Sequence, residues 1–308
     1  MIVLGRAEVA GLLDPDALIE AVGTALVDLS AGRASVPQRI ASFTPAGLLG
    51  AMVAWVPSHD LLAAKLVSVF PRNVGLPTHQ ALIAVFDARS GTPLALLDGE
   101  EITAQRTAAA SALATRLLAR PEARTLAIVG TGVQARSHAR YLPRVRAFRS
   151  LLVAGRDPAK ARELADELGG KAVSIEEAVA SAEVVCATTH AREPVIRREW
   201  LRPGAHLNSV GLHPQGQELD GVSDALVAVE SRSSALAAPP SGANELRGVP
   251  PEQVVELGEL LSGARPGRAS PEQVTIYKSV GVAAEDAAAA ALVLRRARER
   301  GAGRPIDL

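Results

Sequence analysis

Apolar residues in the first third of this chain cluster in short runs separated by turns that contain Pro or Gly, a pattern typical of β-strands. The predicted strands cover residues 51–56, 64–70, 81–87 and 93–97. An amphipathic helix with a capped start is predicted ahead of them, at residues 17–29. We therefore expect this region to be α+β, with a mostly antiparallel sheet.

The pattern changes at residue 101, where an alanine-rich helix runs to Arg120 and ends before Pro121. Beyond it, apolar runs alternate with helical or crossover segments, which predicts a doubly wound parallel sheet of the Rossmann type. The predicted strands of this sheet cover residues 126–129, 151–154, 183–187, 205–210, 225–229 and 274–278. The predicted fold class is therefore α/β, with a separate α+β domain.

A long helix at residues 283–300 follows the last predicted strand and has an apolar face that must pack against another part of the chain. We expect it to return to the N-terminal domain, which makes that domain discontinuous. The predicted domains are residues 1–120, completed by residues 283–308, and a Rossmann domain of residues 121–282. The nicotinamide of a cofactor is expected in a cleft between them.

A glycine turn, GTGVQA, joins the predicted strand at residues 126–129 to a helix that starts at Val133. It fits the dinucleotide pattern G-x-G-x-x-[GA], in which Gly130 can make the tight turn and Gly132 can admit a pyrophosphate. The unpaired amides at the start of the helix suit a phosphate. The alternative is an ordinary tight turn between a strand and a helix.

The residues after the second strand bear on the choice of dinucleotide. Enzymes that use NAD commonly place an acid there, whereas this chain has Gly155 followed by Arg156, with Lys160 one turn later. Two cations suit the 2′-phosphate of NADPH, which we favour, with NADH as the alternative. Asp157 supports that alternative, in which Arg156 only covers the loop or stacks on adenine.

Charge and cysteine content exclude several classes of function. The chain has 33 basic and 33 acidic residues and no basic stripe, so nucleic acid and anionic membranes are not expected partners. Its single cysteine, Cys186, cannot form an intramolecular disulfide, and neither a signal peptide nor a membrane-length apolar stretch is evident. We expect a cytoplasmic protein, and we predict no metal site.

Several polar residues interrupt apolar or strand-like runs, where burial would require a partner. Each has an ordinary interpretation: Lys65 could face solvent at a sheet edge, Arg39 could lie in a surface loop, and Arg106 could lie on the exposed face of its helix. Thr78 and His79 follow a Gly-Leu-Pro turn and could cap it. The residue pattern alone leaves these interpretations open.

An acidic residue, Asp220, follows the predicted strand at residues 205–210. Open α/β sheets bind ligands outside the carboxyl ends of their strands. Asp220 is therefore a better candidate for a functional site than an average surface aspartate, although its spacing alone does not decide the matter.

Six strings of sequence together resemble the ornithine cyclodeaminase and mu-crystallin family. They are KLVSVFPRN, GLPTHQALIAVFDARSGTPLALLDGEEITAQRTAAASALATRLLAR, GTGVQARSHA, WLRPGAHLNSVG, QELD and YKSVGVAAEDAAAA, and the resemblance runs from about Arg39 to Ala290. The strings PTHQA and ITAQRTAAASA are most similar to the ketimine and Δ1-pyrroline-2-carboxylate reductases of the family. Residues 239–245 depart from it, because they read PPSGANE where the family often has Gly-Asp. Whether this loop contacts the substrate stays open.

The resemblance implies a role for each polar candidate. Arg39 and Lys65 would hold the substrate carboxylate, and Arg106 would contact the cofactor phosphate or the substrate. Asp220 would be the acid–base residue, with Lys65 as the second catalytic candidate. The residues implied in cofactor binding are Thr78 and His79 beside the nicotinamide, Thr131, Val133 and Gln134 around the pyrophosphate, and Thr189, Val210 and Ser279 lining the nicotinamide pocket.

By the same resemblance, we expect a homodimer that pairs through its N-terminal domain, which would also bind the substrate. The expected reaction is the NAD(P)H-dependent reduction of a cyclic imino acid, Δ1-pyrroline-2-carboxylate, to L-proline, with Δ1-piperideine-2-carboxylate, reduced to L-pipecolate, as a further candidate substrate. The alternatives are an ornithine cyclodeaminase with bound NAD⁺, an alanine or opine dehydrogenase, and an NADP-dependent small-molecule binder without catalytic activity.

Overall fold

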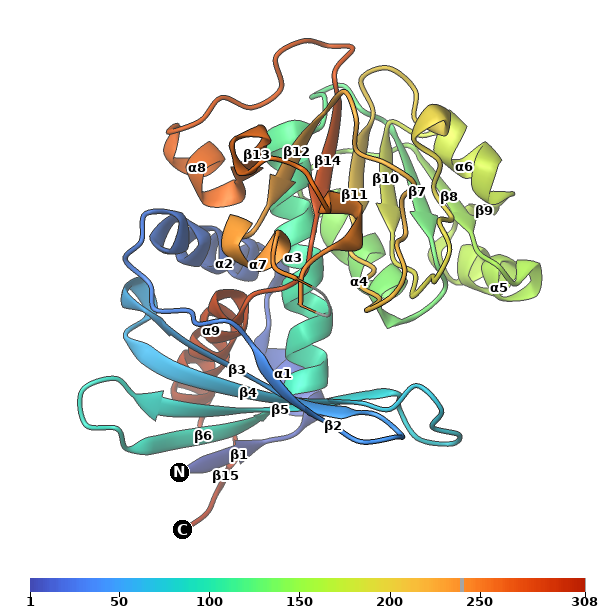
Figure 1. The fold of residues 1–308 in the computed structure, drawn as a ribbon. Helices are drawn as coiled ribbons and strands as arrows, with labels where there is room; N and C mark the ends of the chain where they lie inside the picture. Colours follow the sequence, from blue (N-terminus) through green and yellow to red (C-terminus); the bar gives the residue numbers. More distant parts are fainter. Residues whose placement is uncertain (239–240, 308) are drawn as a thin grey trace. The chain divides into compact units, whose positions relative to one another are not determined.

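The computed structural model describes residues 1–238 and 241–307, so Pro239 and Pro240, in the loop that departs from the family pattern, lie outside the described residues. The chain forms two compact units (Figure 1). Unit 1 comprises Met1–Arg106 and Val282–Leu308, and unit 2 comprises Thr107–Gly281. Within the described ranges, no helix is long and apolar enough to cross a membrane.

The described part of unit 1 contains a seven-stranded sheet with the order β15-β1-β6-β5-β4-β3-β2. Its strands are β1 (Ile2–Leu4), β2 (Ile40–Phe43), β3 (Leu48–Val56), β4 (Leu61–Val69), β5 (His79–Asp87), β6 (Pro93–Asp98) and β15 (Arg304–Pro305). The strands β2 to β6 form antiparallel pairs, whereas β1 pairs with β6 in parallel. The predicted mostly antiparallel sheet is therefore confirmed.

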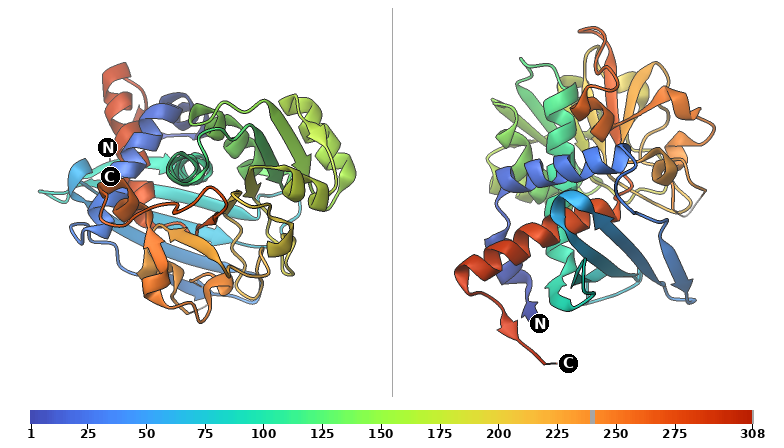
Figure 2. Two further views of the ribbon diagram at one scale, coloured as in Figure 1. Left: turned by 90° about the horizontal axis from the view of Figure 1, so that it is seen from above. Right: turned by 90° about the vertical axis from the view of Figure 1, so that its left-hand side faces the viewer.

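Helices cover one face of this sheet. They are α1 (Arg6–Leu12), α2 (Pro15–Ser30) and α9 (Ala283–Arg300), with a short 3-10 turn at Pro57–His59. The helix α9 packs on β3, β4 and β5, and α2 packs against α9 (Figure 2). The predicted cap of α2 is present, because the Asp14 carboxylate accepts a hydrogen bond from the Ala17 amide over 2.9 Å.

Successive side chains of each strand in unit 1 point to opposite faces of the sheet. One set points toward α9, and the other points away from it. Residues that point toward α9, such as Met52, Ala63 and Ile83, are buried. The outward face is also apolar and is solvent-exposed in the single chain. Its exposed members include Ile40, Leu49, Val53, Leu62, Leu66 and Leu82. We call this set the outer apolar face.

The described part of unit 2 contains an eight-stranded sheet with the order β13-β12-β14-β11-β10-β7-β8-β9. Its strands are β7 (Thr125–Val129), β8 (Ser150–Ala154), β9 (Lys171–Ala172), β10 (Val184–Ala187), β11 (His206–Ser209), β12 (Ala225–Val229), β13 (Val254–Glu256) and β14 (Val274–Lys278). All of these pairings are parallel, so the predicted Rossmann-type sheet is confirmed.

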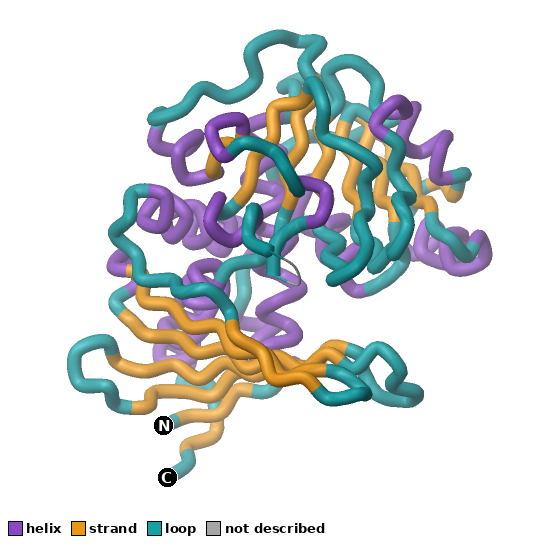
Figure 3. Tube along the Cα trace, in the orientation of Figure 1, coloured by secondary structure: helices purple, strands orange, loops and turns teal. Residues whose placement is uncertain are grey.

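Helices and loops flank the strands of unit 2 (Figure 3). The helices are α4 (Val133–Tyr141), α5 (Pro158–Leu168), α6 (Ile175–Ser181), α7 (Arg232–Ala235) and α8 (Leu257–Ser262), and the 3-10 turns are Leu142–Arg144, Arg198–Trp200, Asn244–Leu246 and Pro251–Gln253. The helix α4 packs on β7, and α5 packs on β8 and β9. These elements bring the glycine turn to the carboxyl end of β7.

The long helix α3 (Gly99–Leu118) runs from unit 1 into unit 2. Its second half joins the parallel sheet through buried polar contacts: the Asn208 side-chain amide donates to Thr115 Oγ1 over 2.9 Å, and Thr275 Oγ1 donates to the Leu118 carbonyl over 3.3 Å. The two compact units divide inside α3, after Arg106, whereas the domain boundary predicted from the sequence lies between residues 120 and 121.

Candidate active site

The glycine turn of unit 2 has the geometry of a dinucleotide site. Gly130 has φ +122°, and a Cβ there would lie 2.4 Å from Thr188 Oγ1, so only glycine fits. A Cβ on Gly132 would meet nothing within 4 Å, which leaves open space on that side of the turn. Gly132 is the N-cap of α4 and provides no side-chain cap, so the first amides of α4 are oriented for an anion.

Three further predicted residues lie at this turn. Val133 is 67% exposed, and Thr131 is half-buried beside Gly155. The Gln134 side-chain oxygen is buried and accepts no hydrogen bond from the described residues. Open space at Gly132 and an uncapped helix start together fit the pyrophosphate of a dinucleotide.

The segment after β8 contains the residues that were predicted to contact the adenosine end. Arg156 and Lys160 are exposed, and Asp157 precedes α5. The Asp157 carboxylate accepts hydrogen bonds from the amides of Ala159, over 2.9 Å, and Lys160, over 3.4 Å, so it caps α5. This capping gives Asp157 a structural role, and its predicted contact with a ribose stays a prediction.

A buried carboxylate, Glu218, organises the carboxyl ends of β10 and β11. Its Oε1 accepts hydrogen bonds from the Thr189 amide, over 2.6 Å, and from Thr189 Oγ1, over 2.7 Å. Its Oε2 accepts from Ser209 Oγ, over 2.8 Å, and from the Gly211 amide, over 3.0 Å. The positions predicted to line the nicotinamide pocket, Thr189 and Val210, therefore belong to segments that Glu218 holds.

The loop that departs from the family pattern contributes an ion pair to the same region. Glu245 lies in this loop, and its Oε1 is 3.0 Å from Lys278 Nζ; both residues are buried. The same oxygen accepts from the Glu218 amide over 2.8 Å, and Lys278 Nζ also donates to Ser209 Oγ over 3.2 Å. The loop is thus fixed to β14 by an acidic residue that the sequence reasoning did not single out.

The next strand end positions Ser279, which was predicted to line the nicotinamide pocket. Ser279 Oγ donates to Glu230 Oε1 over 2.5 Å, and the Gly281 amide donates to the same oxygen over 3.0 Å. Both Glu230 and Ser279 are buried. Glu230 therefore fixes the orientation of the Ser279 hydroxyl.

The structure gives Asp220 a contact that the sequence did not predict. Asp220 is exposed, and its Oδ1 accepts a hydrogen bond from the Arg198 amide over 2.7 Å. This amide belongs to the first residue of the 3-10 turn Arg198–Trp200, so the carboxylate supports the start of that turn. Its predicted acid–base role stays a prediction.

In unit 1, two cations and two carboxylates form a buried cluster. Lys65 lies on β4, and its Nζ is 3.2 Å from Asp286 Oδ1 on α9. Arg106 Nε is 3.0 Å from the same oxygen, and Arg106 Nη1 is 2.7 Å from Glu285 Oε2. Lys65 is 3% exposed and Arg106 is 5% exposed, so the interpretations as a solvent-facing lysine and a helix-surface arginine are wrong. We call these four residues the buried charge cluster.

Electrostatic forces within this cluster oppose one another. Burial lowers the pKa of Lys65 to about 8, Asp286 opposes this change, and Arg106 and Arg39 reinforce it. Burial alone would raise the pKa of Asp286, but Arg106 and Lys65 overcome that effect and hold it below the ordinary value. Arg39 is half-buried, and its effect on Lys65 makes it a third cation of this region.

His79 is the first residue of β5, where it pairs with Val69 of β4. Burial, followed by the charges of Lys65 and Arg106, lowers the pKa of His79 to about 4. The imidazole is therefore neutral near pH 7. Thr78 is exposed, and its carbonyl accepts a hydrogen bond from the Phe70 amide over 2.8 Å.

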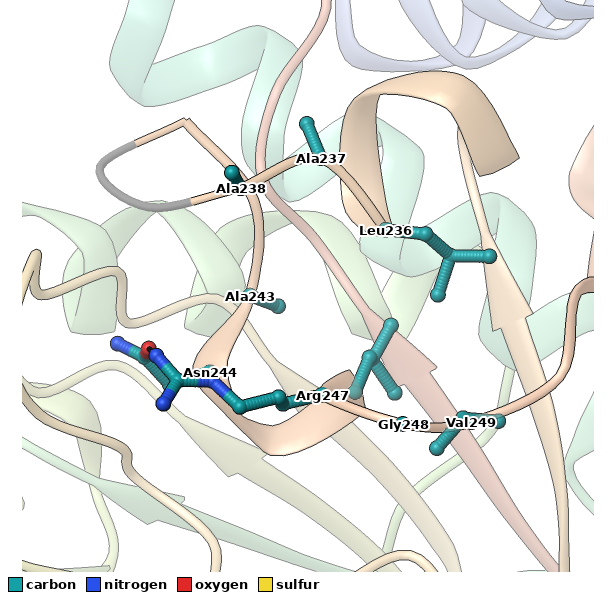
Figure 4. A pocket seen from close by; sticks show the side chains of 9 residues that line it. Leu236, Ala237, Ala238, Ala243, Asn244, Arg247, Gly248 and Val249 are labelled. Atoms are coloured by element: carbon teal, nitrogen blue, oxygen red, sulfur yellow. Dashed lines mark hydrogen bonds between the residues drawn. The ribbon is translucent and has the colours of Figure 1, made fainter.

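A separate cavity of about 300 Å³ lies beside the loop that follows α7 (Figure 4). It is lined by Leu236, Ala237, Ala238, Ala243, Asn244, Leu246, Arg247, Gly248 and Val249. The Asn244 side chain donates to the carbonyls of His213 and Gly216, so it holds two loops together. The residues that line this cavity include none of the predicted site residues.

Known proteins match the chain along nearly its whole length. A model of the ornithine cyclodeaminase/mu-crystallin family matches residues 1–301. The ketimine reductase mu-crystallin of Mus musculus is 39% identical over 289 residues, which are 90% of each chain. The structure of Thermococcus litoralis Δ1-pyrroline-2-carboxylate reductase in complex with NADH and L-proline matches with a TM-score of 0.93 and 33% identity, over 99% of this chain and 100% of that one. An archaeal alanine dehydrogenase dimer with bound NAD matches with a TM-score of 0.92 and 30% identity, over 100% of this chain and 99% of that one.

These matches cover both units, and they include structures in which NADH or NAD is bound. The glycine turn on a parallel sheet and the mixed second sheet agree with them. The chain therefore belongs to the ornithine cyclodeaminase/mu-crystallin family and is an NAD(P)-dependent oxidoreductase of that family.

Proposed function

We propose that this enzyme reduces the cyclic ketimine Δ1-pyrroline-2-carboxylate to L-proline with NAD(P)H, and that it also accepts Δ1-piperideine-2-carboxylate. The relatives named above support this proposal, because one is a ketimine reductase and another was solved with NADH and L-proline. The observation that carries it is the buried charge cluster. Unit 1, with α9, is proposed to bind the substrate, and unit 2 to bind the cofactor.

The charge cluster is suited to a carboxylate next to a C=N bond. Lys65 and Arg106 of the cluster are positively charged, and Arg39 is a third cation of the same region. Asp286 and Glu285 hold Lys65 and Arg106 in place. In a site shielded from water, such charge-assisted hydrogen bonds are stronger than neutral ones and fix the orientation of the carboxylate.

The reaction requires one hydride and two protons. A proton on the imine nitrogen makes the neighbouring carbon electrophilic, the hydride adds to that carbon, and the resulting amine takes the second proton to give zwitterionic L-proline. NAD(P)H supplies the hydride when it is bound. Lys65 has a pKa of about 8, which is near the operating pH and therefore suits a proton donor.

Asp220 is the proposed acid–base residue of unit 2, and a single substitution tests this role. The substitution Asp220→Asn keeps the shape of the side chain and removes its charge. If Asp220 transfers the proton, turnover should fall by orders of magnitude while the dissociation constant of the cofactor changes little. Turnover equal to that of the wild type would assign the proton transfer to Lys65.

We also propose that NADPH is preferred over NADH. Arg156 and Lys160 are exposed next to the glycine turn, where the 2′-phosphate of NADPH would lie in a Rossmann fold. Asp157 is engaged as the cap of α5, which leaves the two cations as the charged groups suited to that phosphate.

We propose that a second copy of the chain covers the outer apolar face. Ile40 and Leu49 on this face are 72% and 52% exposed, and large contiguous apolar patches are unusual on monomers. The match to an archaeal alanine dehydrogenase dimer supports this arrangement. A homodimer through unit 1 would bury the face in an isologous interface.

The proposed reaction is tested by the absorbance of NADPH or NADH at 340 nm in the presence of Δ1-pyrroline-2-carboxylate. Oxidation of the cofactor that depends on the imine would support the proposal. Absence of oxidation, with ammonia released from L-ornithine in the presence of NAD⁺, would replace it with a cyclodeaminase. Reduction of NAD⁺ by L-alanine, with no reaction of the cyclic imine, would favour an alanine dehydrogenase, in line with the archaeal structure.

A further inference from the structure

The acids Glu285 and Asp286 are neighbours in the first turn of α9, but they have different partners. Asp286 Oδ1 contacts both Lys65 Nζ, over 3.2 Å, and Arg106 Nε, over 3.0 Å. Glu285 Oε2 contacts Arg106 Nη1, over 2.7 Å, and accepts from the Val282 amide over 3.3 Å. Asp286 is therefore the acid that contacts Lys65, whereas Glu285 supports Arg106 and the start of the helix.

The location of Asp286 keeps its carboxylate ionised in spite of complete burial. It lies at the amino end of an 18-residue helix, where the positive end of the helix dipole favours a negative charge. Its Oδ2 accepts no hydrogen bond from the described residues, so the two cations at Oδ1 are the groups that hold its pKa below the ordinary value in spite of burial. Asp286 is thus a fixed negative charge beside Lys65 of β4.

Lys65 is surrounded mainly by groups that disfavour its charge. Arg106 from α3 and Arg39 from the segment before β2 repel it, and burial removes water from it. His79 from β5 faces it as well, but that imidazole is neutral above about pH 4. Asp286 from α9 is the group whose attraction opposes these effects.

We propose that Asp286 is a positioning residue for the reaction. It keeps Lys65 protonated and holds its side chain in one place, and it thereby sets the upper pH limit of turnover. This inference rests on the proposed function, in which protonated Lys65 binds the substrate and donates a proton. The relevant form of Lys65 is the protonated one, so kcat/KM should fall as the pH rises through the pKa of Lys65, which is about 8.

The test compares Asp286→Asn with Glu285→Gln, which neutralises the adjacent acid and spares the contact with Lys65. Loss of an opposite charge within 4 Å lowers the pKa of a lysine by about 1–2 units. In Asp286→Asn, the alkaline limb of the kcat/KM profile should therefore move to lower pH by that amount. At pH 8, this shift corresponds to a loss of about 5- to 50-fold, which shrinks toward pH 6. In Glu285→Gln, the limb should stay within a few tenths of a pH unit, whatever happens to KM.

A second readout does not depend on turnover. The ¹³Cε resonance of Lys65, assigned with Lys65→Arg, should titrate near pH 8 in the wild type and lower in Asp286→Asn. The wild type could fail to reduce the imine while the titration of Lys65 still differs between the wild type and Asp286→Asn. This outcome would refute the proposed function and support the link between Asp286 and Lys65. An unchanged titration and an unchanged alkaline limb in Asp286→Asn would overturn the inference.

A folding defect in Asp286→Asn would not prevent the test. In that case Asp286→Glu is measured, because it retains the charge but moves it away from its present position. The limb should then shift in the same direction by a smaller amount. A limb at the wild-type position would refute the positioning role.

Discussion

The contacts of Glu218 allow a prediction that does not depend on the identity of the substrate. Glu218→Gln retains the volume of the side chain, but it replaces one acceptor oxygen with an NH₂ group that faces donors. The carboxylate accepts hydrogen bonds from two backbone amides and two hydroxyls, and it is 2% exposed. The hydroxyls of Thr189 and Ser209 can rotate to other acceptors, whereas at least one backbone amide would lose its partner.

The expected cost follows from these contacts. A buried donor without a partner costs about 1–3 kcal/mol, and the loss of one charge-assisted bond costs about as much. We therefore expect Glu218→Gln to lower the free energy of unfolding by about 2–4 kcal/mol in urea titrations of the cofactor-free protein. The cofactor should also bind more weakly, because the segments at Thr189 and Gly211 are held less firmly.

The matched control is Glu167→Gln. Glu167 forms an ion pair with Arg136 in which each side chain is 47% exposed, and exposed pairs contribute about 0–1 kcal/mol. The control should therefore change the unfolding free energy by less than about 1 kcal/mol. If Glu218→Gln is as stable as this control, the carboxylate does not organise the ends of β10 and β11, and the reasoning is refuted.

Three further predictions concern the turn, the adenosine end and the outer apolar face. Gly130→Ala should lower the Tm by several degrees because of its positive φ and the nearby Thr188 hydroxyl, whereas Gly132→Ala should retain the Tm and weaken cofactor binding about tenfold in fluorescence titrations; equal Tm values for the two variants would contradict this. Arg156→Ala should lower the ratio of kcat/KM for NADPH to that for NADH by about tenfold, through a loss of about 1–2 kcal/mol at the 2′-phosphate; an unchanged ratio would remove Arg156 from that role. Ile40→Lys should convert a dimer into a monomer in light scattering, because a charge would be buried in the interface, whereas Glu20→Lys, a change on α2, should not.

Strongly periodic elements could be predicted from the sequence, and short ones could not. The helix at residues 283–300 was predicted with the bounds that α9 has in the structure, because alanines and leucines recur at helical spacing over five turns. By contrast, β9 has two residues and β13 has three, and segments of that length show no period. Their pairing depends on the neighbouring strands.

The glycine turn was predictable because its signature is local. Gly130 and Gly132 lie in one turn, and the spacing of the two glycines can be read from that turn alone. The cap at Asp14 was predictable for the same reason, since an N-cap acts on an amide only three residues away.

The burial of Lys65 was not predictable from its own strand. Its partner Asp286 is 221 residues away in sequence, and an acid in the first turn of a helix has an ordinary explanation in the helix dipole. Glu218 was similarly ambiguous, because its four contacts join segments that only the parallel sheet brings together. Glu218 lies in the string QELD and Asp286 in the string AAED, and both strings belong to the resemblance to the family. That resemblance was the signal that could have identified the two acids.

The most direct test of the central claim compares two imines that differ only in the carboxylate. The enzyme is assayed at 340 nm with NADPH and either Δ1-pyrroline-2-carboxylate or Δ1-pyrroline. If the cations of unit 1 hold the carboxylate, loss of two charge-assisted contacts of about 1.5–3 kcal/mol each should lower kcat/KM by about 10²–10⁴-fold for Δ1-pyrroline. Similar kcat/KM values for the two imines would contradict the account, because the buried charge cluster would then have no part in recognising the substrate.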